Sequence, residues 1–224
     1  MLIRINNLTA GYDSRPVLKD VNCEIRRGEW IGIIGPNGGG KTTLVKSIVG
    51  LLVPIAGYIH YYNKEGQETD NVTVGYLPQK SDIDTMFPIS VEEVVLSGLM
   101  SQLGWWRRPS RVQRRRVAEV LEKTGLSDLK KSPIGSLSGG QMQRAMFGRA
   151  IVSQPELLVL DEPNSYLDME FETRLYELLS ELHDEGSTIL MVSHELGSVQ
   201  SLVNRVFTVE GHIAESDAVS PLSL

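Results

Sequence analysis

One glycine-rich stretch, residues 35–42, constrains the fold of this chain more than any other part of its sequence. It reads G-P-N-G-G-G-K-T and matches the pattern G-x-x-x-x-G-K-[ST]. The continuous apolar run Trp30–Ile34 precedes it and predicts a strand buried on both faces of a parallel sheet. Residues 42–52 follow with helical periodicity, and Pro54 ends the predicted helix. The motif therefore lies between a strand and a helix, which is the context a phosphate-binding loop requires.

The residue types in this loop suit a nucleotide. Glycines allow backbone N–H groups to surround phosphate oxygens, and the helix N-terminus adds its positive end. We expect Lys41 to reach the β and γ phosphates and the Thr42 hydroxyl to bind Mg²⁺. The alternative is a glycine-rich turn that merely precedes a helix, and the strand–loop–helix context disfavours it. The predicted nucleotide-binding residues here are Gly35, Pro36, Asn37, Gly38, Gly39, Gly40, Lys41, Thr42 and Thr43.

A second apolar run, residues 157–160, ends at two adjacent carboxylates, Asp161 and Glu162. Ligands of open α/β sheets bind at the carboxyl ends of the strands, so we expect both side chains near the phosphate loop. Asp161 would hold Mg²⁺, usually through water, and Glu162 would polarise the water that attacks the γ-phosphate. Two such carboxylates alone could be a solvated turn, but beside a phosphate loop they favour a catalytic magnesium site.

The wider pattern indicates an α/β fold with a parallel sheet. A strand at 157–160, a helix with apolar residues from Phe171 to Leu182 and a strand at 188–192 follow one another. Between Gln79 and Gln154 strand patterns are replaced by amphipathic, helix-like segments. Further predictions are strands near residues 2–6 and 21–26, a turn at Gly11-Tyr12, helices over 91–99 and 112–124, and a loose tail at 216–224.

Composition excludes several classes of protein. The net charge of −6 at pH 7 disfavours general nucleic-acid binding. The single cysteine, Cys23, cannot form an internal disulfide and predicts a small core residue in a reducing compartment. No apolar run reaches the roughly 18–20 residues of a membrane span, and residues 1–9 lack the pattern of a secretory signal. We therefore expect a cytoplasmic protein.

A second glycine-containing motif, Leu137-Ser138-Gly139-Gly140-Gln141, opens a predicted helix over residues 142–151. With it, residues 1 to about 212 resemble the ATP-binding-cassette (ABC) family of transport ATPases. Ser138 and the N–H groups of Gly139 and Gly140 at a helix N-terminus suit a phosphate. In the family this loop caps the nucleotide held by the other subunit. The resemblance therefore implies a homodimer that holds ATP and Mg²⁺ between two chains, and poor hydrolysis by one chain alone.

Three more positions match the family in order. Tyr12 corresponds to the aromatic residue that stacks on adenine, and Gln79, in Y-L-P-Q, to the glutamine that senses Mg²⁺ and the membrane partner. His194, in V-S-H, corresponds to the histidine that contacts the γ-phosphate. Each alone could be an exposed turn tyrosine, a polar loop residue or a helix-start histidine. The resemblance thus assigns catalysis to Glu162, His194 and Gln79, and Mg²⁺ to Thr42, Gln79 and Asp161.

Asp168 matches the loop through which the two subunits of the family communicate. The family more often has a small residue where Tyr166 stands, which weakens that assignment. The phosphate loop also has Gly39 where alanine or serine is common and Thr42 where serine is common; both changes should preserve the chemistry.

The resemblance implies one ABC ATPase domain over residues 1–224, with a RecA-like P-loop core. The core and an N-terminal antiparallel β subdomain would comprise 1–80 and 155–224, and a helical subdomain with the signature loop would comprise 81–154.

The resemblance also indicates which class of ABC protein this chain would be. No sustained heptads separate Lys41 from Ser138, only one cassette is present and no membrane span is fused to it. We therefore expect a peripheral subunit on the cytoplasmic face of the inner membrane that binds a permease, serves a solute-binding protein indirectly and binds no nucleic acid. Residues 86–95 are similar to cassettes for zinc, manganese or iron uptake, although 164–167 depart from the usual metal-group sequence. Siderophore or haem import, export, and a soluble role without transport are the alternatives.

Six arginines lie in the segment 105–116 beside Trp105 and Trp106. Three interpretations stay open: a solvated helix face, contact with anionic lipid headgroups or a membrane subunit, and nucleic-acid binding. The arginines are Arg107, Arg108, Arg111, Arg114, Arg115 and Arg116.

Overall fold

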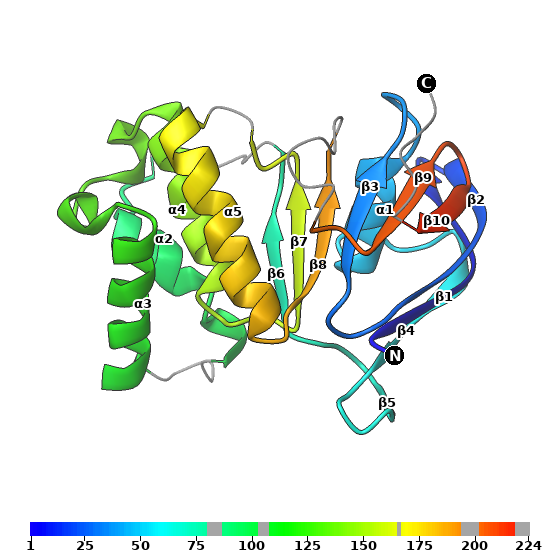
Figure 1. The fold of residues 1–224 in the computed structure, drawn as a ribbon, viewed down its shortest axis with the longest axis horizontal. Helices are drawn as coiled ribbons and strands as arrows, with labels where there is room; N and C mark the ends of the chain where they lie inside the picture. Colours follow the sequence, from blue (N-terminus) through cyan, green and yellow to red (C-terminus); the bar gives the residue numbers. More distant parts are fainter. Residues whose placement is uncertain (80–86, 103–107, 165–166, 194–201, 218–224) are drawn as a thin grey trace.

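The computed structural model describes residues 1–79, 87–102, 108–164, 167–193 and 202–217, in which two sheets carry the fold (Figure 1). The larger sheet has six strands in the order β10-β9-β3-β8-β7-β6. All neighbours in it are parallel except β10, which pairs antiparallel with β9. Its strands are β3 (Trp30–Ile34), β6 (Val74–Leu77), β7 (Leu157–Asp161), β8 (Thr188–Val192), β9 (Arg205–Val209) and β10 (Ile213–Asp217). The predicted α/β fold with a mainly parallel sheet is confirmed.

The smaller sheet is antiparallel and has the order β2-β1-β4-β5. The predicted turn at Gly11-Tyr12 is wrong, because Tyr12 still pairs with Arg15 and the turn lies at residues 13–14. Gly11 serves a different purpose: a Cβ there would lie 1.9 Å from the Arg15 carbonyl oxygen, so the close strand pairing excludes a side chain. The strands are β1 (Ile3–Tyr12), β2 (Arg15–Ile25), β4 (Ala56–Tyr62) and β5 (Glu68–Thr69).

In the described part of the chain, the regular elements between β6 and β7 are all helical, as the amphipathic segments predict. The first helix, α1, stops short of the predicted end because Gly50 adopts a left-handed conformation, with φ 76°. The helices are α1 (Lys41–Ile48), α2 (Val91–Ser97), α3 (Arg111–Lys123), α4 (Gly139–Ile151) and α5 (Met169–Asp184), with short 3₁₀ turns η1 (Met100–Gln102), η2 (Ser127–Leu129) and η3 (Ile134–Ser136).

Buried strands of the larger sheet separate two hydrophobic cores. Alternate side chains of a strand point to opposite faces, so Leu158 and Leu160 of β7 pack with helices α2 to α5, whereas Leu157 and Val159 pack with α1 and the smaller sheet. This double burial explains why β3, β7 and β8 read as continuous apolar runs. It also fixes their carboxyl ends at one edge of the molecule.

Two further expectations concern Cys23 and the C-terminus. Cys23 is a buried residue of β2, as predicted, and burial raises the pKa of its thiol to about 12. The expected loose tail is wrong at its start, because Ser216 and Asp217 pair with β9 as part of β10. Among the described residues, no helix combines the length and apolarity needed to cross a membrane.

Candidate nucleotide-binding site

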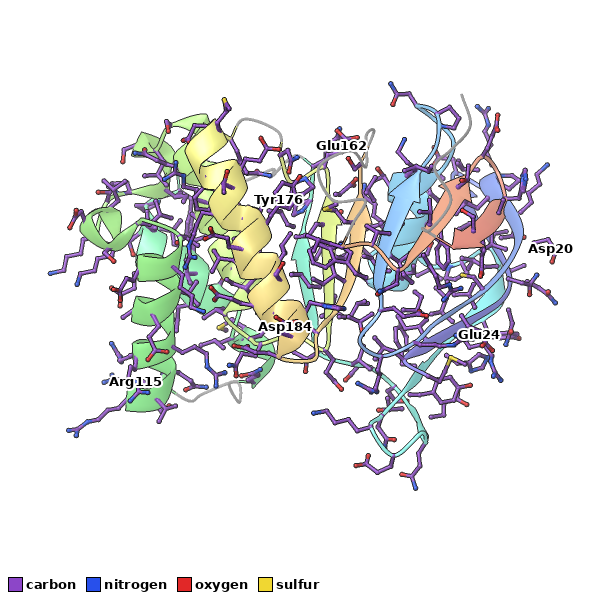
Figure 2. All side chains as sticks on the ribbon, viewed as in Figure 1. Asp20, Glu24, Arg115, Glu162, Tyr176 and Asp184 are labelled. Carbon is purple, nitrogen blue, oxygen red and sulfur yellow. The ribbon has the colours of Figure 1, made fainter. Side chains whose placement is uncertain are left out.

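A pocket of about 360 Å³ lies at the carboxyl edge of the larger sheet, beside the loop from β3 to α1. Figure 2 shows Glu162 at this edge, just after β7. The pocket brings together residues predicted from separate motifs. Its lining residues are Tyr12, Val17, Asn37, Gly38, Gly40, Lys41, Thr42, Thr43, Gln79 and Glu162.

Close packing fixes the backbone of the loop. Gly35 has φ 143°, and a Cβ there would lie 2.2 Å from the Val209 carbonyl oxygen on β9. Gly40, the N-cap residue of α1, has φ 105°, and a Cβ there would meet the Leu18 side chain at 2.6 Å. Side chains are thus excluded at both ends of the loop. The loop presents main-chain atoms and the positive end of α1 to the pocket.

Lys41 is a buried cation at the floor of the loop. It is 7% exposed, and its Nζ donates to the carbonyl oxygens of Gly35 at 2.8 Å and Pro36 at 3.1 Å. Within the described ranges, no carboxylate forms an ion pair with it. The charge of Asp161 still interacts with Lys41, which opposes the rise in the pKa of that carboxyl. A buried cation with only this partial compensation favours further negative charge beside it. An anionic phosphate in this pocket would therefore be stabilised by Lys41.

Asp161 and Thr42 form the candidate cation position. The Thr42 hydroxyl donates to Asp161 Oδ2 at 3.1 Å, while Oδ1 is buried and has no hydrogen-bond partner among the described residues. Burial raises the pKa of Asp161, opposed by the Thr42 hydrogen bond. A divalent cation would satisfy the orphaned oxygen and favour the ionised carboxylate. These oxygen donors therefore fit Mg²⁺.

Glu162 has an unusual backbone conformation at the pocket edge. Its φ is 54°, in the left-handed region that non-glycine residues rarely adopt, at a cost on the order of 1 kcal/mol. Its N–H donates to the Val192 carbonyl oxygen at 3.1 Å, which ties the turn to β8. The side chain accepts a hydrogen bond of 2.6 Å from Gln79 Nε2. The structure therefore joins the predicted base and the predicted sensor glutamine directly.

Two residues in or beside the pocket belong to none of the predicted motifs. Val17 lines it from β2, beside Tyr12, whose side chain is 44% exposed. Lys46 lies outside the loop motif, but its Nζ is 5.9 Å from the centre of the Tyr12 ring. No local pattern marks either residue, because the packing of α1 against β1 and β2 brings them there.

The signature residues lie apart from this pocket. Ser138 is the N-cap residue of α4 and forms a capping box with Gln141, which leaves Gly139 and Gly140 in the first turn of the helix. None of the residues 138–141 lines the pocket described above. Within one chain, the structure thus keeps the two predicted phosphate-binding motifs apart.

Asp168 lies at the N-cap of α5 and joins that helix to α4. Its carboxylate accepts from the Phe171 N–H at 2.8 Å and pairs with Arg144 at 2.5 Å, and the backbone hydrogen bond from Phe171 with the Arg144 pair lowers its pKa. The guanidinium of Arg144 also lies 4.4 Å from the centre of the Phe171 ring. His194 and Tyr166, to which the sequence assigns roles, lie outside the described residues.

Comparison with known proteins adds independent evidence. The family model described as "ABC transporter" matches residues 18–165. A manganese transport system ATP-binding protein of Bacillus subtilis is 37% identical over 88% of this chain and 79% of its own length. A zinc uptake system ATP-binding protein of Listeria monocytogenes is 38% identical over 95% of this chain and 84% of its own.

Solved structures agree with the fold. A metal-chelate type ABC transporter in an inward-facing conformation aligns with a TM-score of 0.81 at 26% identity, over 99% of this chain and 85% of that one. A dimeric bacterial ABC transporter cassette aligns with a TM-score of 0.82 at 25% identity, over 98% and 100% of the two chains.

Proposed function

Because the chain belongs to the ABC transporter family, we propose that it is the ATPase subunit of a membrane importer for a metal ion, namely zinc, manganese or iron. The observation that carries this proposal is the identity of 37–38% to manganese and zinc transport cassettes over most of the chain. The site supplies the chemistry: the pocket contains a glycine loop, a buried lysine and Glu162, and Asp161 lies beside it, hydrogen-bonded to Thr42.

In the proposed reaction, the residues of the pocket orient ATP for attack by water. Tyr12 stacks on the adenine, the N–H groups of the loop surround the phosphates, and Lys41 contacts the β and γ phosphates. Thr42, Asp161 and Gln79 would hold Mg²⁺, which supplies positive charge against the charge that develops on the phosphate oxygens. Glu162 accepts a proton from the attacking water. Gln79, 2.6 Å from Glu162, positions that carboxylate.

Two copies of the chain complete each site. The signature residues Ser138 to Gln141 lie apart from the pocket of their own chain and would cap the nucleotide held by the second copy. The dimeric cassette with the same fold supports this arrangement. ATP binding would close the dimer and hydrolysis would reopen it.

A groove of about 540 Å³ supports a docking site for the permease. It runs along the edge strand β6 between the C-terminal ends of α1, α2 and α4. Pro78, next to Gln79, lines it, and so does Leu51, whose side chain is 64% exposed. A segment of the permease in this groove would contact the chain beside the glutamine that reaches Glu162. Permease movement and nucleotide state would thereby be coupled.

A mild-detergent pull-down of the tagged chain from native membranes, with identification by mass spectrometry, tests this function. We expect a polytopic membrane protein and, with it, a solute-binding protein with metal ligands. Recovery of ribosomes, DNA or the homodimer alone would contradict the transporter while leaving the ATPase intact.

One second candidate has specific support. The alignment with a metal-chelate type transporter favours a siderophore or haem complex as the cargo. The same pull-down discriminates, because a solute-binding protein for a chelate would have a cavity for an organic ligand.

A further inference from the structure

The exposed basic end of α3 is not used by the proposed reaction. Arg111, Arg114 and Arg115 share the solvent face of this helix, at the i, i+3 and i+4 spacing, and Arg108 precedes the helix on the surface. The side chain of Arg115 is 82% exposed. In a chain with a net charge of −6, these side chains form a concentrated positive patch. We call these four residues the arginine patch.

The position of the patch at the start of α3 is unfavourable for the helix itself. The first turn of α3 contains no acidic residue, and its first carboxylate is Glu119 in the second half. Acidic side chains stabilise a helix N-terminus and basic ones a C-terminus, so this order of charges opposes the helix dipole. An anionic surface bound at the N-terminal end of α3 would offset this unfavourable interaction between the arginines and the helix dipole.

Internal partners neutralise little of this charge. Across the ranges that the structure describes, the only ion pair of the patch is Arg115–Glu119, and both members are more than half exposed. Among the described residues, Arg114 Nε donates to the Pro109 carbonyl oxygen alone, at 3.4 Å. Exposed pairs of this kind contribute little to stability. The guanidinium groups are thus available to an external partner.

An exposed apolar side chain accompanies the arginines. Val112, on the flank of the same helical turn, is 70% exposed. Arginines beside an exposed apolar residue are typical of surfaces that lie on a bilayer, where phosphate headgroups bind the cations and the apolar group enters the interface. A polynucleotide would instead follow a longer basic surface, which a chain with this negative net charge does not favour.

The patch lies far from the catalytic edge. In Figure 2, Arg115 lies at the end of α3 opposite to Glu162, near the edge at which β6 and β7 begin. Val74 and Gly75, at the start of β6, line the groove proposed for the permease. A partner at the arginine patch would therefore leave the nucleotide pocket free and lie on the same edge as this end of the groove.

We propose that the arginine patch binds the phosphate headgroups of anionic lipids and, with Val112, holds the subunit against the bilayer beside its permease. The orientation rests on the proposed function, because the groove defines the side that faces the membrane. Lipid binding itself is testable without the permease.

Vesicle flotation tests this proposal with purified full-length chain. Vesicles of phosphatidylcholine alone are compared with vesicles containing phosphatidylglycerol, for the wild type, the variant R111Q/R114Q/R115Q and the matched control K19Q/R26Q/K64Q, which removes three exposed charges elsewhere. Each arginine at an anionic surface contributes roughly a fivefold increase in binding. We expect binding only to anionic vesicles, a loss of at least about tenfold in the patch variant, and no such loss in the control.

Equal loss in both variants, or no binding of the wild type to anionic vesicles, would overturn the proposal. The wild type could fail to bind vesicles while the patch variant no longer recovers the permease in the pull-down. In that case an acidic loop of the permease is the partner, and the lipid proposal is wrong. Unchanged ATP hydrolysis and thermal unfolding of the patch variant establish that the pocket and the fold are intact. Failure of the pull-down in the wild type would instead contradict the proposed function.

Discussion

At the scale of single residues, the pairing of Glu162 with Gln79 sets the sharpest expectation. Glu162→Gln retains the shape of the side chain but removes the proton acceptor, so ATP should still bind and the closed dimer should accumulate. We expect turnover to fall roughly 100-fold or more. Single-turnover hydrolysis and size-exclusion chromatography with ATP measure the two effects. Rapid hydrolysis by this variant would remove Glu162 from the role of base.

A second prediction at the scale of single residues concerns Lys41 and the affinity for ATP. Lys41→Ala removes the buried cation at the floor of the loop, and charge-assisted hydrogen bonds contribute about 1.5–3 kcal/mol each. We expect the affinity for ATP to fall on the order of tenfold to a hundredfold, measured by titration with a fluorescent ATP analogue. Lys64→Ala, at an exposed position, is the control. Equal affinities of the two variants would contradict the loop assignment.

The sequence predicts residues of the pocket where a local pattern carries them. The glycine loop, Asp161 and Glu162 are recognisable because each follows a buried apolar strand, whose end fixes their position. Val17, which lines the pocket, and Lys46, which lies beside the Tyr12 ring, carry no such signal. Their positions depend on how α1 packs against the smaller sheet. The left-handed conformation of Glu162 has no local sequence signal either, and it occurs where the Glu162 N–H donates to the carbonyl oxygen of Val192 at the end of β8.

At the scale of elements, Asp168 makes two separable contacts, a capping hydrogen bond within α5 and an ion pair with Arg144 of α4. Asp168→Asn retains an acceptor for the Phe171 N–H but removes the charge beside Arg144, whereas Asp168→Ala removes both. We expect the alanine variant to lower the melting temperature more than the asparagine variant. Equal melting temperatures of the two variants would contradict a capping role for Asp168.

The stability from Asp168 also depends on pH with a defined sign. The pKa of Asp168 is lower in the folded state than in the unfolded state, where it is about 3.9. Its contribution to the free energy of unfolding is therefore complete above about pH 3.9 and is lost as the pH falls through the lower pKa of the folded state. The melting temperatures of the wild type and Asp168→Ala should therefore converge on acidification. Divergence in acid would contradict this linkage.

The elements that the sequence misses are those with weak patterns of their own. β10 contains Ala214 and three polar residues, and it becomes a strand by pairing with β9 at the edge of the larger sheet. β4 has no fully buried residue and pairs with β1 on one side and with the two-residue strand β5 on the other. Buried strands such as β7 are predictable, because both faces are apolar. Strands with few buried residues depend instead on pairing with their neighbours in the sheet.

At the scale of the whole molecule, the separation of the two phosphate-binding motifs predicts complementation between chains. Lys41→Ala inactivates one pocket, and Gly139→Asp places a negative charge at the start of α4, where it repels phosphate. Each variant alone should be nearly inactive. A mixture contains heterodimers with one intact composite site, so we expect hydrolysis to reappear on mixing. Absence of any recovery, with heterodimers verified by differential tags, would contradict the shared site.

ATP-driven metal import is tested by measuring metal uptake into vesicles that contain the chain with its copurified permease. We expect radioactive zinc or manganese to cross the membrane only when ATP is present on the face that carries the ATPase. Glu162→Gln should abolish this transport while ATP remains bound. Transport that continues unchanged with Glu162→Gln, or ATP hydrolysis without movement of any metal or chelate, would contradict ATP-driven metal import.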